Sequence, residues 1–174
     1  EATIVAVTGR DEAAATLTEA CREAGIAPSL VSDANRRTTT KVRVVTERNQ
    51  QVARIDYEVD DEIAGEIESR VIAEIEKHAP RAAAIVVSDY LKGCVTRQVV
   101  QKALAAAAGR GVPLLVDPKI PHLSYYTGAS GVTPNHHEAE AATGVRVRSE
   151  EDARRAARLF RERAGGRGVG LPRG

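Results

Sequence analysis

Residues 83–119 read AAIVVSDYLKGCVTRQVVQKALAAAAGRGVPLLVDPK. Residues 83–88 are an apolar run of strand length, residues 97–108 are rich in alanine, as a helix would be, and residues 113–117 are a second apolar run. Apolar strands that alternate with helices are typical of a parallel sheet covered on both faces. This stretch therefore predicts a β-α-β unit and an α/β fold.

The alternation continues on both sides of this unit. Residues 3–7 read as a buried strand, and residues 11–24 read as a helix that Asp11 caps. Residues 61–78 carry isoleucine or valine at every fourth position, which predicts an amphipathic helix. Toward the C-terminus we expect a weaker strand and two helices, at residues 129–133, 135–143 and 150–163. The whole pattern predicts a doubly wound, mostly parallel sheet.

One pair of strands interrupts the alternation. Residues 41–47 and 51–58 are rich in β-branched or alternating residues, and only residues 48–50 join them. Such a short connection favours an antiparallel pair. We expect a small antiparallel lid over about residues 37–58, attached to an otherwise parallel domain of residues 1–164.

The end of the chain departs from the pattern. Where another apolar strand is due, residues 165–174 contain five glycines and a proline. This composition does not suit a central strand, so we expect an irregular tail, either a frayed or an artificial chain end. An RNA-binding Arg/Gly tail is a weak alternative, because the segment is short and has no aromatic residue.

Composition excludes several classes of protein. The chain has 174 residues, a net charge of +1 and 3% aromatic residues, which argues against nucleic-acid binding. No apolar run approaches 18 residues, so no membrane span is expected, and the N-terminus does not resemble a signal peptide. The two cysteines are far apart and fit neither a disulfide framework nor a zinc site. We expect a cytoplasmic protein.

Polar clusters follow three consecutive strands of the predicted sheet. They are Ser88–Gly93, Asp117–Lys119 and Thr133–Glu138. Each cluster alone is most simply a capped loop. Ligands of α/β sheets gather at the carboxyl ends of the strands, where these clusters offer carboxylates for a divalent cation and amines for phosphates. Together they suit phosphoryl transfer.

The motifs occur in an order that resembles a known family. Residues 37–43 read RTTTKVR, residues 49–51 NQQ and residues 54–56 RID, and SDYLKG, VDPK and TPNHHE follow at residues 88–93, 116–119 and 133–138. This ordered set is similar to the PfkB/ribokinase family of carbohydrate kinases, and most of all to the D-glycero-β-D-manno-heptose-7-phosphate kinases. The resemblance covers residues 3–160 and implies a ribokinase-like fold.

The resemblance implies an activity and a set of site residues. The activity is phosphorylation of the anomeric hydroxyl of heptose 7-phosphate by ATP with Mg²⁺, a step of ADP-heptose synthesis for lipopolysaccharide. The sugar phosphate and ATP would be its ligands, and a homodimer would form through the lid. Residues expected to bind ATP and Mg²⁺ are Asp117, Lys119, Asn135, His136, His137 and Glu138. Residues expected to contact the sugar phosphate are Lys41, Arg43, Gln51, Arg54, Asp89 and Lys92.

No direct metal ligand is expected among these residues. His136 and His137 are neighbours on a predicted helix, where their side chains point about 100° apart and chelate poorly. Glu138 suits a water-mediated contact with a hard cation.

The chain also departs from the family pattern. Leu91 and Ile120 stand where the family has glycine. The family's glycine-rich sugar-binding segment and its Gly-Ala-Gly-Asp turn, which carries the catalytic base, do not occur in the 174 residues. We therefore expect an internal fragment of a kinase, truncated at both ends and inactive alone. The alternative is a non-catalytic remnant that binds nucleotide or sugar phosphate.

Overall fold

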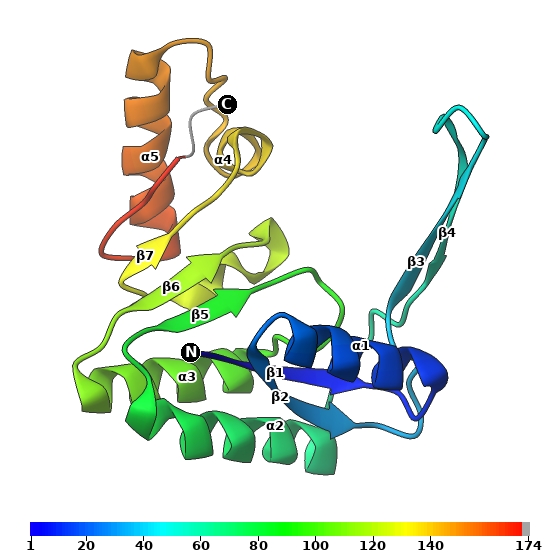
Figure 1. The fold of residues 1–174 in the computed structure, drawn as a ribbon. Helices are drawn as coiled ribbons and strands as arrows, with labels where there is room; N and C mark the ends of the chain where they lie inside the picture. Colours follow the sequence, from blue (N-terminus) through cyan, green and yellow to red (C-terminus); the bar gives the residue numbers. More distant parts are fainter. Residues whose placement is uncertain (172–174) are drawn as a thin grey trace. The chain divides into compact units, whose positions relative to one another are not determined.

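The computed structural model describes residues 1–171, which form two compact units (Figure 1). The first unit comprises residues 1–74 and 92–94. The second comprises residues 75–91 and the chain from residue 95 onward. Helix α2 (Gly65–His78) begins in the first unit and ends in the second.

The first unit opens with a β-α-β element. Strands β1 (Ala2–Thr8) and β2 (Ile26–Ser32) pair in parallel, and α1 (Glu12–Glu23) connects them. The Asp11 side chain caps α1 by accepting a hydrogen bond from the amide of Ala14, as expected. Strand β2 was not predicted from the sequence, because Pro28 interrupts its apolar pattern. Within the described residues β2 pairs only with β1, so it is an edge strand, where proline is tolerated.

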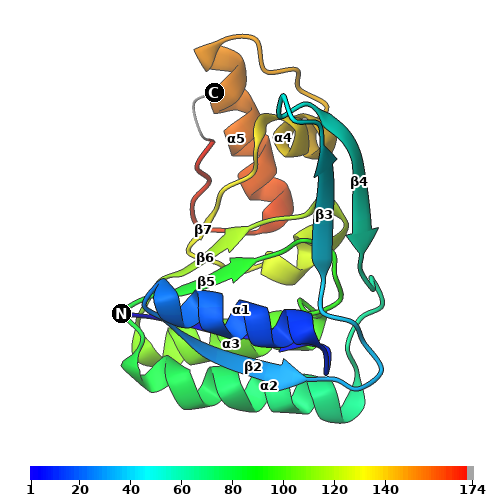
Figure 2. The same cartoon turned by 45° about the vertical axis from the view of Figure 1, so that its right-hand side comes forward.

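The predicted antiparallel pair of strands in the lid segment is confirmed. Strands β3 (Thr40–Val45) and β4 (Gln51–Tyr57) form a two-stranded antiparallel sheet, seen as a long hairpin in Figure 2. Neither strand pairs with any other strand of residues 1–171. The pairing register places Val42, Val44 and Ile55 on one face of the hairpin, and the charged residues Lys41, Arg43, Arg54 and Asp56 on the other.

The second unit contains the predicted parallel sheet, in the order β5-β6-β7. Its strands are β5 (Ile85–Ser88), β6 (Leu114–Asp117) and β7 (Gly131–Val132). The helices are α3 (Arg97–Arg110), α4 (His136–Thr143) and α5 (Glu150–Ala164), with the short helices η1 (Ala79–Arg81) and η2 (Ile120–Tyr126). One buried cluster joins the strands, all three α-helices and η2, and Tyr126 and Phe160 are its largest members.

The glycine-rich tail is irregular but not frayed up to residue 171, which corrects the expectation of a frayed end. The amide of Val132 donates to the carbonyl of Gly168 (3.1 Å), and the amide of Gly170 donates to the carbonyl of Val132 (2.9 Å). Val169 thereby forms an isolated parallel bridge with β7 and packs against the buried cluster. Residues 172–174 lie outside the described residues. No helix among the described residues has the length and apolarity that crossing a membrane requires.

Candidate functional site

Parallel pairing brings three of the predicted polar loops to one edge of the β5-β6-β7 sheet. Ser88 pairs with Asp117, and Val116 with Val132, so all three strands end at the same side. The loops are also bonded to the neighbouring strands. The amide of Asp89 donates to the carbonyl of Asp117 (3.1 Å), and that of Thr133 to the carbonyl of Val116 (2.9 Å). The predicted loops at residues 88–93, 117–119 and 133–138 therefore begin at the same edge of the sheet, as expected.

Asn135 and Glu138 form a reciprocal capping box at the start of α4. The Asn135 side-chain oxygen accepts from the amide of Glu138, and a Glu138 carboxylate oxygen accepts from the amide of Asn135, both at 2.9 Å. This box satisfies two amides that the first turn of a helix leaves without partners. The box holds the exposed Asn135 side chain at the sheet edge. The side-chain amino group of Asn135 takes no part in the capping box.

Lys119 forms an ion pair with Glu138 across the same edge. The other carboxylate oxygen of Glu138 already binds the amide of Asn135, so the nearly buried carboxylate is held from two sides. Glu138 raises the pKa of Lys119, and the nearby charge of Asp117 adds to this effect. The Lys119 ammonium therefore stays charged, and with three N–H donors it can bind an anion in addition to Glu138.

The remaining predicted nucleotide residues lie close in sequence to these groups. Asp117 is half-buried at the end of β6, and His136 and His137 are the first two residues of α4. His136 also lines an open hollow of about 600 Å³ that residues of α5 and the preceding loop complete. Within residues 1–171, no cluster of three or more histidine, cysteine, aspartate or glutamate side chains could hold a metal ion.

Asp89 does not lie where a substrate could reach its carboxylate. The residue is 1% exposed, and its oxygens accept from the amide of Leu91 (2.8 Å), the hydroxyl of Tyr126 (2.6 Å) and Nδ1 of His122 (2.6 Å). The predicted substrate contact is not supported by this environment. Sequence reasoning missed Tyr126 and His122, because neither belongs to a recognisable motif.

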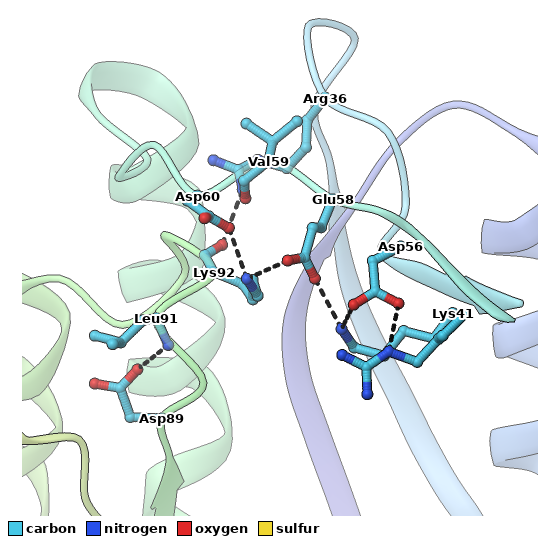
Figure 3. Close-up of polar contacts among 10 residues, drawn as sticks. Arg36, Lys41, Asp56, Glu58, Val59, Asp60, Asp89, Leu91 and Lys92 are labelled. Carbon is cyan, nitrogen blue, oxygen red and sulfur yellow. Dashed lines mark hydrogen bonds and ion pairs between the residues drawn. The ribbon is translucent and has the colours of Figure 1, made fainter. Parts of the chain in front are cut away.

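In the first unit, the cations of the lid are held by carboxylates (Figure 3). Lys41 lies between Asp56 (3.0 Å) and Glu58 (2.9 Å), and Lys92 lies between Glu58 (2.6 Å) and Asp60 (2.8 Å). Hydrogen bonds to Glu58 and then Asp56 raise the pKa of Lys41, and hydrogen bonds to Asp60 and then Glu58 raise that of Lys92. We call these residues, together with Arg54, the ion ladder.

The two predicted arginines of the lid differ in whether they form an ion pair. Arg54 donates from Nε to Asp56 (3.0 Å), whereas Arg43 forms no ion pair with any residue from 1 to 171. The two arginines are directly opposite each other in the strand register, an arrangement that is unfavourable for like charges. Gln51 lies at the other end of β4, opposite Val45 and away from the ladder.

Arg36 is a residue of this region that sequence reasoning missed. Its guanidinium donates to the carbonyls of Val59 (3.1 Å), Lys92 (2.9 Å) and Asp61 (2.6 Å). It thereby joins the end of the lid to the loop of Lys92. Gly93 in this loop has φ of +74°, and a Cβ there would lie 1.9 Å from the Asp61 carbonyl oxygen. Only glycine allows this close approach.

The turn after β1 fixes the other end of the lid. The Asp11 carboxylate accepts from the amide (2.8 Å) and the hydroxyl (2.6 Å) of Thr38, which is buried. The Thr38 hydroxyl in turn accepts from the amide of Gly9 (2.9 Å). Hydrogen bonds from Thr38 lower the pKa of Asp11. The GRDE segment at residues 9–12 therefore anchors the first residues of the lid.

A model of the family described as "pfkB family carbohydrate kinase" matches residues 1–165. The chain belongs to this family. The Bifunctional protein HldE of Pelobacter propionicus is 42% identical over 95% of the chain, which spans 34% of that protein. The D-beta-D-heptose 7-phosphate kinase of Bordetella bronchiseptica is 38% identical over 91% of the chain, which spans 49% of that protein.

Solved structures show the same fold. Phosphofructokinase-2 from Escherichia coli in complex with fructose-6-phosphate has a TM-score of 0.75 at 18% identity, over 98% of this chain and 56% of that one. The chain spans about a third of the length of the HldE relatives that it matches and about half of the structural relatives. The ribokinase-like α/β fold expected from the sequence is confirmed.

One departure from the pfkB pattern places a non-glycine residue in a left-handed backbone conformation. Leu91 stands where the family resemblance has glycine, and its φ of +53° lies in the left-handed region that glycine favours. The amide of Leu91 binds the Asp89 carboxylate in this turn (Figure 3). Leucine has therefore kept a backbone conformation suited to glycine. Ile120, the second departure, has no positive φ.

Proposed function

We propose that the chain is part of a kinase that phosphorylates heptose 7-phosphate at its anomeric hydroxyl, using ATP, within ADP-heptose synthesis. The arrangement of Lys119, Glu138 and Asn135 at the carboxyl edge of the β5-β6-β7 sheet carries this proposal. The similarity to HldE and to a heptose 7-phosphate kinase over more than nine-tenths of the chain supports the choice of sugar. A cytoplasmic location suits an enzyme that uses ATP.

The strand edge of the second unit would bind the phosphates of ATP. Lys119 offers a permanent positive charge, and the Asn135 amino group offers a neutral donor. Asp117, His136 and His137 complete the proposed set. Positioning and charge stabilisation account for most of the catalysis of phosphoryl transfer.

The donor set fits a magnesium ion held mainly by phosphates and water. Both Glu138 oxygens already have protein partners, and the described residues contain no cluster that would bind a metal directly. Mg²⁺ in kinases commonly keeps several waters and takes one or two carboxylates. Glu138 would contact it through water, and Asp117 is the nearby alternative. The bound ion would neutralise charge on the phosphates.

The charged face of the lid would bind the sugar phosphate. Arg43 is the first choice for the phosphate contact, because no carboxylate of the described residues neutralises it. Lys41, Arg54 and Lys92 would take part only by exchanging carboxylate partners for the substrate. Gln51, at the far end of β4, is proposed as a polar contact.

The apolar face of the lid would bind a second copy of the chain. Val42, Val44 and Ile55 lie on the face opposite the charged residues and are 41%, 43% and 45% exposed. Two such faces packed together would remove this apolar surface from water, which favours association. A homodimer formed through the lid is therefore the proposed assembly.

A chimeric enzyme tests the proposed reaction. Residues 1–164 would replace the matching segment of the Bordetella bronchiseptica kinase, and ADP release would be measured with heptose 7-phosphate, ATP and Mg²⁺. We expect turnover that depends on the sugar phosphate and falls strongly in an Asn135→Ala chimera. A chimera that is folded by circular dichroism and binds ATP, but does not phosphorylate heptose 7-phosphate, would disprove the proposal.

The 174-residue chain itself should bind ATP without turnover, because it contains no Gly-Ala-Gly-Asp sequence. A general base contributes roughly 10²–10⁴-fold to such reactions, and an anion-hole donor about 10²–10³-fold. The same ADP-release assay, applied to the chain alone, measures its turnover. Turnover that Asn135→Ala abolishes would show that a carboxylate within the chain serves as base.

A further inference from the structure

Asp89 is the centre of a buried polar cluster next to the proposed nucleotide site. An ionised carboxylate can only accept hydrogen bonds, and burying one is unfavourable unless its oxygens are bonded. Here one oxygen accepts from the Leu91 amide, and the other accepts from the Tyr126 hydroxyl and from His122 Nδ1, both at 2.6 Å. We call Asp89, His122 and Tyr126 the Asp89 cluster.

The direction of each hydrogen bond follows from the chemistry. Tyr126 has a single hydroxyl hydrogen, and it must point to the carboxylate, which has none to give. The phenol oxygen is then left as an acceptor, and the amide of Lys119 donates to it (3.2 Å). Burial, followed by the hydrogen bond to Asp89, raises the pKa of Tyr126 and keeps its hydroxyl protonated.

The histidine of the cluster is also fixed in place. The ring of His122 stacks on Tyr125, with ring centroids 4.4 Å apart, and the Arg97 guanidinium covers Tyr125 at 4.5 Å. This stacking restricts the orientation of the His122 ring, whose Nδ1 atom contacts the same Asp89 carboxylate oxygen as the Tyr126 hydroxyl. The two donors hold the Asp89 carboxylate between β5 and η2.

Lys119 is thus bonded through both its backbone amide and its side-chain ammonium. Its amide binds Tyr126, and its ammonium binds Glu138, whose other oxygen binds the amide of Asn135. We propose that the Asp89 cluster, acting through the Tyr126 hydroxyl, positions Lys119 for the phosphates of ATP. The proposal rests on the proposed function and adds positioning residues to it.

Packing alone does not account for a tyrosine at this position. Tyr126 is fully buried in the apolar cluster, where a phenylalanine ring would fill the same volume. The hydroxyl is the only difference, and both of its hydrogen bonds go to loops at the carboxyl edge of the sheet. A buried tyrosine hydroxyl needs such partners. Its role is therefore to connect the Asp89 loop with the Lys119 loop.

Tyr126→Phe tests the proposal while keeping the aromatic ring. Binding of ATP with Mg²⁺ to the 174-residue chain would be measured by calorimetry for wild type, Tyr126→Phe, Lys119→Ala and the double variant. We expect Tyr126→Phe to weaken binding about tenfold, since the Lys119 amide loses its buried acceptor. The double variant should bind no more weakly than Lys119→Ala, because both changes remove the same function.

A core variant separates positioning from loss of stability. Val71→Ala removes buried apolar volume from α2, outside the buried cluster that contains Tyr126, so it should lower the melting temperature and leave ATP affinity unchanged. Unchanged affinity in Tyr126→Phe would overturn the proposal. Fully independent effects of Tyr126→Phe and Lys119→Ala in the double variant would overturn it as well.

Hydrogen exchange of the Lys119 amide gives a readout that needs no nucleotide. If the wild-type chain binds no ATP, the proposed function fails, and this exchange decides whether Tyr126 positions Lys119. We expect the amide to exchange at least tenfold faster in Tyr126→Phe than in wild type, with no such local change in Val71→Ala. Equal exchange rates in Tyr126→Phe and wild type would overturn the positioning role.

Discussion

Replacing Leu91 with glycine should stabilise the protein relative to replacing it with alanine. Leu91 has φ of +53° in the turn that binds the Asp89 carboxylate. In this region the Cβ of a non-glycine residue is too close to its own backbone, at a cost of roughly 1–2 kcal/mol. Glycine removes that strain and keeps the amide that donates to Asp89.

The comparison with alanine isolates the backbone effect. Leu91→Gly and Leu91→Ala both remove the half-buried leucine side chain, but only glycine relieves the strain. Glycine also has more conformational freedom in the unfolded chain, which lowers the free energy of unfolding of Leu91→Gly by about 0.5–1 kcal/mol. The difference in the free energy of unfolding should therefore be about 0.5–1 kcal/mol in favour of Leu91→Gly.

Thermal and urea unfolding followed by circular dichroism measure this difference. For a chain of this size it corresponds to about 1–4 °C in melting temperature. Ile120 provides a matched control, because it also stands where the family has glycine but has no positive φ and packs against the core. Ile120→Gly should destabilise the protein. If Leu91→Ala proves as stable as Leu91→Gly, the turn is not strained and the reasoning fails.

Three further predictions concern the lid and its attachment. Gly93→Ala should destabilise the protein by more than 1 kcal/mol in urea unfolding, since its Cβ would meet a carbonyl oxygen at 1.9 Å, whereas Gly109→Ala, which meets no atom within 4 Å, should not. The folded-state pKa of Asp11 lies below its usual 3.8, so the stabilising effect of Asp11 is present above ~pH 4 and is lost as the pH falls through the folded pKa. Asp11→Asn should therefore flatten the loss of stability that acid unfolding shows as the pH falls below ~pH 4. Val42→Glu and Val44→Glu should shift the chain from dimer to monomer in sedimentation, and a wild-type monomer would refute the proposed assembly.

Much of the fold could be predicted because its signals are local. The apolar runs before Ser88 and Asp117 and the alanine-rich helix between them determine the β-α-β unit within about 35 residues. The lid strands were recognisable from the short connection between them. Strand β2 was missed because Pro28 breaks its pattern, and parallel pairing with β1 at an edge compensates for this.

Contacts within the candidate site could be predicted from the sequence only where the contacting residues belong to one short motif. Asn135 and Glu138 are three residues apart, the spacing of a capping box, so sequence alone places them together. Arg36 instead binds the carbonyl of Lys92 56 residues away, and Asp89 binds Tyr126 37 residues away. Contacts of this kind depend on how the folded chain brings loops together, and no local pattern encodes them.

The ion ladder changes how the cations of the lid should be interpreted. From the sequence, Lys41, Arg54 and Lys92 looked available for a phosphate, but each is held by a carboxylate. These pairs are partly exposed to solvent, and exposed ion pairs contribute little net stability and weaken with salt. A dianionic substrate could therefore displace the carboxylates at low energetic cost. Arg43 needs no such exchange, so binding of the phosphate would begin there and extend along the ladder.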